Sequence, residues 1–422
     1  MAMSVAMGGA GSHEYVLAAV WSLSAAYNVG GGGDIRRMHS AFSYYDRAVR
    51  LLQPVTPASW QDNQAYLTTI FLLAWFDIVV FDPDKWTVHL RMACGLVNSQ
   101  DDVDAMWATA SGRRIVHAVA RLDCSNALCN RAPPMLCQRA YNLLAHEPRR
   151  NIDDSSLDQQ VDAECMRLHG ILGRAAHLSY HWTLGGGELD SDVDVQTRSV
   201  LSQLQDWHDR LPAALQWPRT DDGEHIDDLA ILAAWLADKP PLFKKLWLHY
   251  LAITVHLYHM LDPVASGLWN ASVQLARRCL LLVQVCHDAD DGRPHSLYNG
   301  DMSILFVLAV VGVLIDDPGD RSWIQAYLLQ HRRETLWCGY ERAACLRAWW
   351  RSLDAGKRLI LSQPDRQDTP LLVGSGRDGD DDNNCEYGVG NTVKVRILYE
   401  DLVTRQVQAD YHEFAYCELA AG

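Results

Sequence analysis

Three aspartates near residue 316 have a spacing that could bind magnesium. Asp316, Asp317 and Asp320 spell DDxxD, and in some all-helical enzymes this pattern stacks carboxylates on a helix face, where they hold the metal ions that bind a diphosphate. The intervening Pro318 and Gly319 instead favour a loop that leads into a helix start. We therefore expect Asp317 to act as an N-cap, whose carboxylate accepts hydrogen bonds from the first backbone N–H groups.

Three histidines on one helical segment could also bind a metal. At about 100° per residue, His249 and His256 share a face and His259 lies near it. Imidazole is a common metal ligand. The same face carries Leu246 and Ile253, however, and histidines among core residues usually form ordinary hydrogen bonds. We expect this structural role and keep metal binding as an alternative.

The cysteines do not form a recognisable metal or redox motif. The chain has 11 cysteines and no Cys-x-x-Cys. The tightest group is Cys124, Cys129 and Cys137, whose gaps fit neither a zinc finger nor a binuclear cluster. No nucleophile elbow, P-loop or dinucleotide fingerprint occurs either. The sequence therefore predicts no catalytic residue, no cofactor-binding residue and no metal ligand.

The overall charge argues against a surface that binds nucleic acid. The chain of 422 residues has 37 basic and 52 acidic side chains, a net charge of −15, and 49% hydrophobic residues. Proteins that bind nucleic acid gain most of their affinity from Lys and Arg. The longest apolar runs, 70–81 and 304–315, are shorter than the roughly 20 residues that cross a bilayer. We expect a globular protein without a membrane segment.

The elements that must position these residues are helical nearly throughout. Apolar residues recur at steps of three and four from Met38 to Leu52, which predicts an amphipathic helix. The segment 67–81 is apolar on nearly every side, so we expect Trp75 and Ile78 in the centre of the core. Further helices are predicted at about 102–122, 160–183, 195–211, 242–260, 269–287, 302–315, 320–332 and 336–355.

The predicted fold class is all-α, a large multi-helix regulatory domain with a possible short β hairpin in its C-terminal tail. We expect a disordered N-terminus over 1–12 and the helical domain over 13–360. Residues 361–422 form a Gly/Asp-rich linker and a strand-like tail, in which apolar residues alternate from Val393 to Tyr399.

Three fragments occur in an order and spacing typical of one protein family. They are Tyr44–Leu52, Leu67–Asp77 and Trp86–Arg91. Together with residues 13–27 and 317–324, they resemble the fungal-specific transcription factor domain, the helical regulatory region of fungal zinc binuclear cluster regulators. The resemblance identifies ten family-motif residues, and we expect structural roles for them: Tyr45, Arg47, Trp75, Trp86, His89, Leu90, Arg91, Asp317, Arg321 and Trp323.

The resemblance implies a transcriptional regulator in the nucleus and no enzymatic activity. The six-cysteine DNA-binding cluster that normally precedes this domain is not in the chain. We therefore expect the chain not to bind DNA alone, but through a missing domain or a partner, and to hold zinc only if such a cluster exists. Other transcription proteins or a second copy are the expected partners, and a small apolar ligand is possible.

Two alternatives from other classes remain open. The first is a helical small-molecule-binding protein outside transcription, with a pocket lined by some of the 15 tryptophans, such as Trp235, Trp247, Trp349 and Trp350. The second is a terpene-cyclase-like magnesium enzyme that uses Asp316, Asp317 and Asp320.

Overall fold

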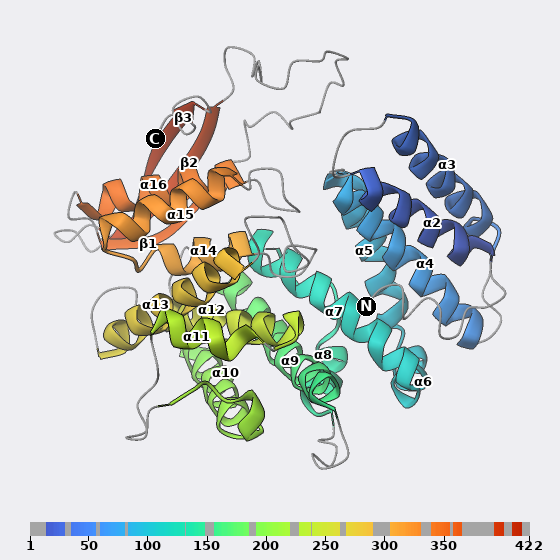
Figure 1. The fold of residues 1–422 in the computed structure, drawn as a ribbon, viewed down its shortest axis with the longest axis horizontal. Coiled ribbons are helices and arrows are strands. Elements are labelled where there is room, and N and C mark those ends of the chain that lie inside the picture. The colour runs from blue at the N-terminus through green and yellow to red at the C-terminus, as the bar shows by residue number, and fades with distance from the viewer. Residues whose placement is uncertain are drawn as a thin grey trace.

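A computed structural model shows the chain as an assembly of helices with a small sheet near its C-terminus (Figure 1). No described helix is long and apolar enough to cross a membrane. The predicted disordered N-terminus, 1–12, and the Gly/Asp-rich stretch 374–384 of the predicted linker lie outside the described residues. The structure describes residues 14–29, 35–55, 60–80, 83–130, 132–147, 156–184, 191–219, 228–237, 239–261, 267–289, 304–330, 339–354, 358–364, 392–400 and 407–415.

The N-terminal helices form one side of the molecule, drawn in blue in Figure 1. They are α2 (Glu14–Val29), α3 (Ile35–Leu52), α4 (Trp60–Val79) and α5 (Pro83–Asn98). Helix α2 packs along α3 and α4, and α4 packs along α5. Helix α3 is amphipathic as predicted, with Ala41, Tyr45, Ala48 and Leu52 buried at steps of three and four.

The predicted helix 102–122 is in fact two helices, α6 (Gln100–Ala108) and α7 (Ala110–Asn130). The break lies at Thr109, whose backbone is extended and whose Oγ1 accepts a hydrogen bond from the Gly112 N–H at 3.0 Å. Thr109 is thus the N-cap of α7, a local signal that the apolar pattern concealed. Helices α8 (Gln138–Ala145), α9 (Leu157–Leu184) and α10 (Ser191–Asp209) follow.

Helix α12 (Pro241–Leu261) lies in the middle of the second half of the chain and packs against α9, α10, α13 and α14. Its neighbours in sequence are the 3-10 turn η2 (Ala213–Leu215) and α11 (Leu229–Ala237) before it, and α13 (Gly267–Ala289) after it. Helices α14 (Ile304–Gly312), α15 (Pro318–Gln330) and α16 (Gly339–Asp354) complete the helical part.

The tail forms a three-stranded antiparallel sheet in the order β1-β2-β3. Strands β2 (Thr392–Glu400) and β3 (Val407–Ala415) make the predicted hairpin, with Arg396 opposite Tyr411. Strand β1 (Arg358–Pro364) was not predicted, because its sequence does not alternate between apolar and polar residues. The sheet packs on α16, where the Arg351 guanidinium lies 5.0 Å from the ring centroid of Phe414.

Helix α4 is central to the N-terminal half, but one prediction about it is wrong. Ile70 and Phe76 are fully buried and Ile78 is 4% exposed, as expected for a helix that is apolar on most sides. Trp75 is only partly buried and lies at the margin of the core, where its ring contacts Phe71 at a centroid distance of 6.2 Å. A helix that is apolar all round still has one side that its neighbours cover less well.

Candidate functional site

A buried polar contact joins α4 and α5 within the family-like segment. His89 Nδ1 lies 2.7 Å from Oδ2 of Asp77, whose residue is 1% exposed. The ring of Tyr45, on α3, contacts Phe76 at 4.7 Å and His89 at 6.2 Å between centroids. The segment therefore joins three helices around one carboxylate–imidazole pair, and the role of this pair is to hold the helices together.

The other family-motif residues of this region also have structural surroundings or lie at the surface. Trp86 and Leu90 are buried on the inner face of α5. Arg47 forms an exposed ion pair with Glu14, which links α3 to α2. Arg91 is exposed on α5. Structural roles are expected for both His89 and Arg91, and the structure shows a contact to a neighbouring helix for His89.

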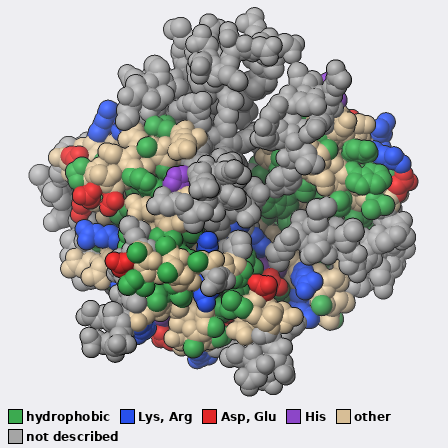
Figure 2. Space-filling model, in the orientation of Figure 1, with side chains coloured by type: hydrophobic (Ala, Val, Ile, Leu, Met, Phe, Trp, Pro, Cys, Tyr) green, Lys and Arg blue, Asp and Glu red, His purple; other side chains and the backbone are tan. Residues whose placement is uncertain are grey.

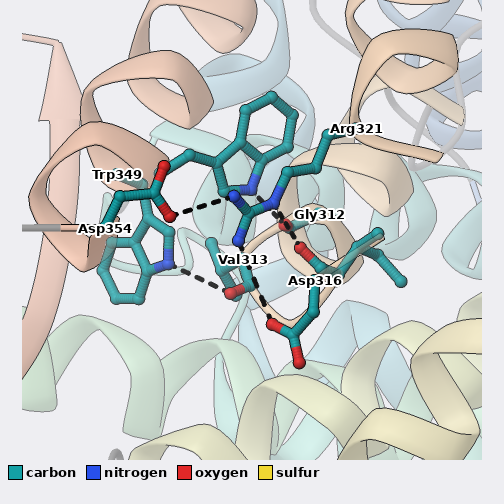
Figure 3. Close-up of polar contacts among 8 residues, drawn as sticks. Gly312, Val313, Asp316, Arg321, Trp349 and Asp354 are labelled. Atoms are coloured by element: carbon teal, nitrogen blue, oxygen red, sulfur yellow. Dashed lines mark hydrogen bonds and ion pairs between the residues drawn. The ribbon is translucent and has the colours of Figure 1, made fainter. Parts of the chain in front are cut away.

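The three aspartates of the DDxxD pattern lie at the start of α15 and have separate surroundings. Oδ1 of Asp317 accepts a hydrogen bond from the Asp320 N–H at 2.9 Å, so the predicted N-cap is confirmed. Asp316 faces Arg321 at 3.9 Å (Figure 3). Burial, followed by the charge of Asp317, raises the pKa of Asp320. Because each carboxylate has its own role or surroundings, the arrangement does not support the magnesium site of a terpene-cyclase-like enzyme.

Arg321 connects the α14–α15 turn to α16. Its Nε donates a hydrogen bond to the Ile315 carbonyl at 2.7 Å, and its Nη1 donates to Asp354 Oδ1 at 3.2 Å. The guanidinium also lies 5.5 Å from the ring centroid of Trp350, a cation–π contact. The indole N–H of Trp350 donates to the Gly312 carbonyl at 2.9 Å.

A second indole contact runs parallel to the first. Nε1 of Trp349 donates to the Val313 carbonyl at 3.0 Å, so two neighbouring indoles bind the last carbonyl of α14 and the carbonyl that follows it (Figure 3). These carbonyls have no partner within their own helix, since they lie at its C-terminal end. Trp323, the remaining motif residue, is partly buried on α15 and contacts the Tyr327 ring at 5.2 Å.

A row of buried imidazoles crosses the interface of α7, α9 and α12. His117 Nε2 lies 3.2 Å from His169 Nδ1, and the rings of His169 and His249 are 5.4 Å apart. Burial, followed by the charge of Arg121, lowers the pKa of His169 to about 3. Burial and the same guanidinium lower the pKa of Lys245 to about 7. His169 is therefore neutral near pH 7, and the row places polar side chains inside an apolar core.

The three histidines of α12 do not converge on one point. His249 belongs to the imidazole row, whereas His256 Nε2 lies 2.8 Å from Ser179 Oγ. His259 packs between the rings of Trp182 and Trp349, at 5.9 and 5.6 Å. No group of three or more His, Cys, Asp or Glu side chains among the described residues is placed to hold a metal ion. The alternative of a metal site on this segment is therefore not supported.

The tryptophans of the second half pack on one another. The ring of Trp217 lies 5.6 Å from Trp235 and 5.2 Å from Trp247, and Trp235 lies 5.1 Å from Phe243. Beside this cluster is a surface depression with mainly polar walls, lined by His208, Asp209, Gln216, Trp217 and Arg219. Polar walls do not suit an apolar ligand. The small apolar ligand stays a prediction.

One surface pair was missed by sequence reasoning. His177 and His181 are both exposed on α9, and their Nε2 atoms are 3.1 Å apart. The signal in the sequence is His-x-x-x-His, which puts two side chains on neighbouring turns of a helix. That signal alone does not tell whether the pair faces solvent or the core.

The comparison with known proteins agrees with the fragments described above. A family model, the fungal specific transcription factor domain, matches residues 4–362. No curated protein and no solved structure matches the chain. The matched range contains every helix among the described residues and ends within β1, so β2 and β3 lie outside it. Because the match covers most of the sequence, the chain belongs to the family of proteins with the fungal specific transcription factor domain.

Proposed function

We propose that this chain regulates transcription in the nucleus as a helical effector domain, without catalytic activity. The observation that carries the proposal is the family match over residues 4–362. The described contacts of the motif residues support it, since Asp77–His89 and Arg321–Asp354 join neighbouring helices. A domain whose motif residues serve to join its helices would regulate transcription through contacts made by its surface.

The chain does not contact DNA by itself in this proposal. The net charge is −15 and the sequence contains no Cys-x-x-Cys. On the face drawn in Figure 2, Lys and Arg side chains are scattered among Asp and Glu. A partner protein, or a zinc-cluster domain outside this sequence, would bring the chain to its target genes, since phosphate binding needs a concentrated basic surface.

Fluorescence anisotropy with labelled duplex DNA tests this part. The purified chain is titrated at several salt concentrations between about 50 and 200 mM, the range over which phosphate contacts weaken strongly. We expect no saturable binding at any of these concentrations. Tight binding whose affinity falls steeply with salt would contradict the proposal.

A second copy of the chain is the partner that the described surface favours. Between Tyr15 and Ala26, helix α2 has no charged residue, yet Leu17 and Trp21 are 41% and 47% exposed. Figure 2 shows hydrophobic side chains over α2 and α3 at the right. A helix that is apolar all round is usually covered. The Glu14–Arg47 ion pair beside it presents both signs of charge, which suits a two-fold contact between identical surfaces.

Light scattering after size-exclusion chromatography tests this pairing at micromolar concentration. We expect a dimer for the native chain and a monomer for Trp21→Glu, because a buried unpaired carboxylate opposes association. Val195→Glu is the matched control, since Val195 is 63% exposed on α10 and lies far along the chain from α2. A native chain that is monomeric, or a Trp21→Glu variant that still dimerises, would contradict the proposal.

A further inference from the structure

Two exposed imidazoles lie side by side on the last turns of α9. His177 and His181 are four residues apart, so they occupy neighbouring turns of one face. Their Nε2 atoms are 3.1 Å apart and their ring centroids 4.6 Å apart. One ring nitrogen donates its hydrogen to the other, which requires at least one neutral imidazole with a lone pair at Nε2.

The separation of the two nitrogens matches that of a chelated metal ion. Two metal–nitrogen bonds of about 2.0–2.1 Å that meet at 90–109° place the nitrogens roughly 2.9–3.4 Å apart. The observed 3.1 Å falls inside this range. To bind an ion, the donor ring must move its proton from Nε2 to Nδ1, and both exposed rings must rotate so that their lone pairs turn from each other toward one shared position.

The scaffold holds the pair in place before any ion binds. Between the two histidines, Leu178 and Ser179 are buried, and Ser179 Oγ lies 2.8 Å from His256 Nε2 on α12. Trp182, directly after the pair, is 1% exposed. These contacts fix the last turns of α9 against the core, so binding an ion would cost little conformational entropy.

The helix dipole favours a cation at this position. His181 lies in the last turn of α9, where the helix dipole is negative. Arg174, one turn before His177, directs its Nη1 to Gln203 Oε1 at 2.6 Å, on α10.

We propose that His177 and His181 bind one divalent transition-metal ion through their Nε2 atoms, with water in the remaining coordination positions. The ion belongs to the class that prefers imidazole, Cu²⁺, Ni²⁺ or Zn²⁺, and Cu²⁺ binds most tightly. This site is independent of the zinc-cluster cysteines of the wider family and of the proposed regulation of transcription.

Calorimetric titration of the full chain in metal-free buffer at pH 7.5 tests the site with CuCl₂, NiCl₂ and ZnCl₂. We expect one equivalent to bind with an affinity that falls by roughly tenfold or more in His177→Ala and in His181→Ala, because the ion then keeps a single imidazole and loses the chelate. His146→Ala is the matched control and should bind as the native chain does. His146, the C-cap of α8, is also exposed, but its Nδ1 bonds to the backbone carbonyl of Asn142.

Electron paramagnetic resonance of bound Cu²⁺ gives a readout that does not depend on affinity. Two coordinated nitrogens should produce a hyperfine pattern that each single variant reduces to one nitrogen. Both substitutions are at the surface and should change the free energy of unfolding by less than about 0.5 kcal/mol, which circular dichroism can check. A double variant that carries both His177→Ala and His181→Ala completes the test. If it binds Cu²⁺ with unchanged affinity and spectrum, the ion binds at other histidines among the 17 of the chain, and the proposal is wrong.

Discussion

Asp77 and His89 form a carboxylate–imidazole contact of 2.7 Å between α4 and α5. Asp77 is almost fully buried, at 1% exposure, in a helix that is otherwise apolar around it. A buried carboxylate is costly unless it is hydrogen-bonded. The pair therefore explains why an aspartate is tolerated within the apolar segment 67–81, and why a histidine lies in the middle of α5.

Replacing His89 should destabilise the domain through this contact. We expect His89→Ala to lower the free energy of unfolding by about 1–3 kcal/mol, because it removes a hydrogen bond from a buried carboxylate. Urea denaturation would measure the change. Asp77→Asn retains an oxygen that can accept the Nδ1 hydrogen and should cost less than His89→Ala. Equal stability of the native chain and His89→Ala would show that the contact contributes nothing.

The N-cap of α15 predicts that the native chain is the most stable, followed by Asp317→Ser and then Asp317→Ala. Asp317→Ala should lower the free energy of unfolding by about 1 kcal/mol, and Asp317→Ser should lower it much less, because a hydroxyl can also accept the Asp320 N–H. Thermal denaturation with and without Mg²⁺ would measure both effects. Magnesium-dependent turnover of a prenyl diphosphate that both variants abolish would contradict the capping role.

The imidazole row predicts that the chain loses stability in acid. The pKa of His169 is about 3 in the folded chain, against an ordinary 6.5, and that of His117 is also lowered well below 6.5, mainly by burial. Below pH 6.5 the unfolded chain binds protons that the folded chain does not, so the free energy of unfolding should fall by about 1.4 kcal/mol per pH unit for each fully shifted histidine.

Denaturation of the native chain and of His169→Gln at pH 7 and pH 5.5 measures this dependence. The variant should show a smaller loss between the two pH values, even if it is less stable at both. His146→Gln, an exposed control, should keep the native slope. Lys245 acts in the same direction at higher pH. Its pKa is about 7 when folded and 10.5 when unfolded, so stability should continue to rise between those values.

The partial exposure of Trp75 predicts a contrast with its neighbour. Phe76 is fully buried, so Phe76→Ala should cost about 3–5 kcal/mol. Trp75→Ala should cost less, although indole is the larger side chain, because part of it already contacts water. Denaturation of both variants would decide this, and a larger loss for Trp75→Ala would contradict the burial described.

Some of these features can be predicted from residues that lie close together in the sequence. Asp317 and Pro318 are adjacent to the helix that they start, so the cap was predicted from residue types alone. The stripe of α3 and the alternation of β2 are also local patterns. By contrast, Asp77 and His89 are 12 residues apart and meet only because α4 packs along α5.

The features that were missed depend on tertiary packing or on weak local signals. The break at Thr109 rests on one capping hydroxyl within a continuous apolar pattern. Strand β1 exists because β2, more than 25 residues later, pairs with it. The spacing of His177 and His181 is visible in the sequence, but their exposure depends on which side of α9 the core covers.

A reporter assay tests most directly the claim that this family domain regulates transcription. The chain is fused to an unrelated DNA-binding domain, and reporter output is compared with that of the DNA-binding domain alone in the same cells. A matched fusion with Phe76→Asp, which places a charge in the core, serves as the unfolded control. We predict that the native fusion raises or lowers reporter output and that the control does not. A silent native fusion that is shown to be folded and nuclear would contradict the account.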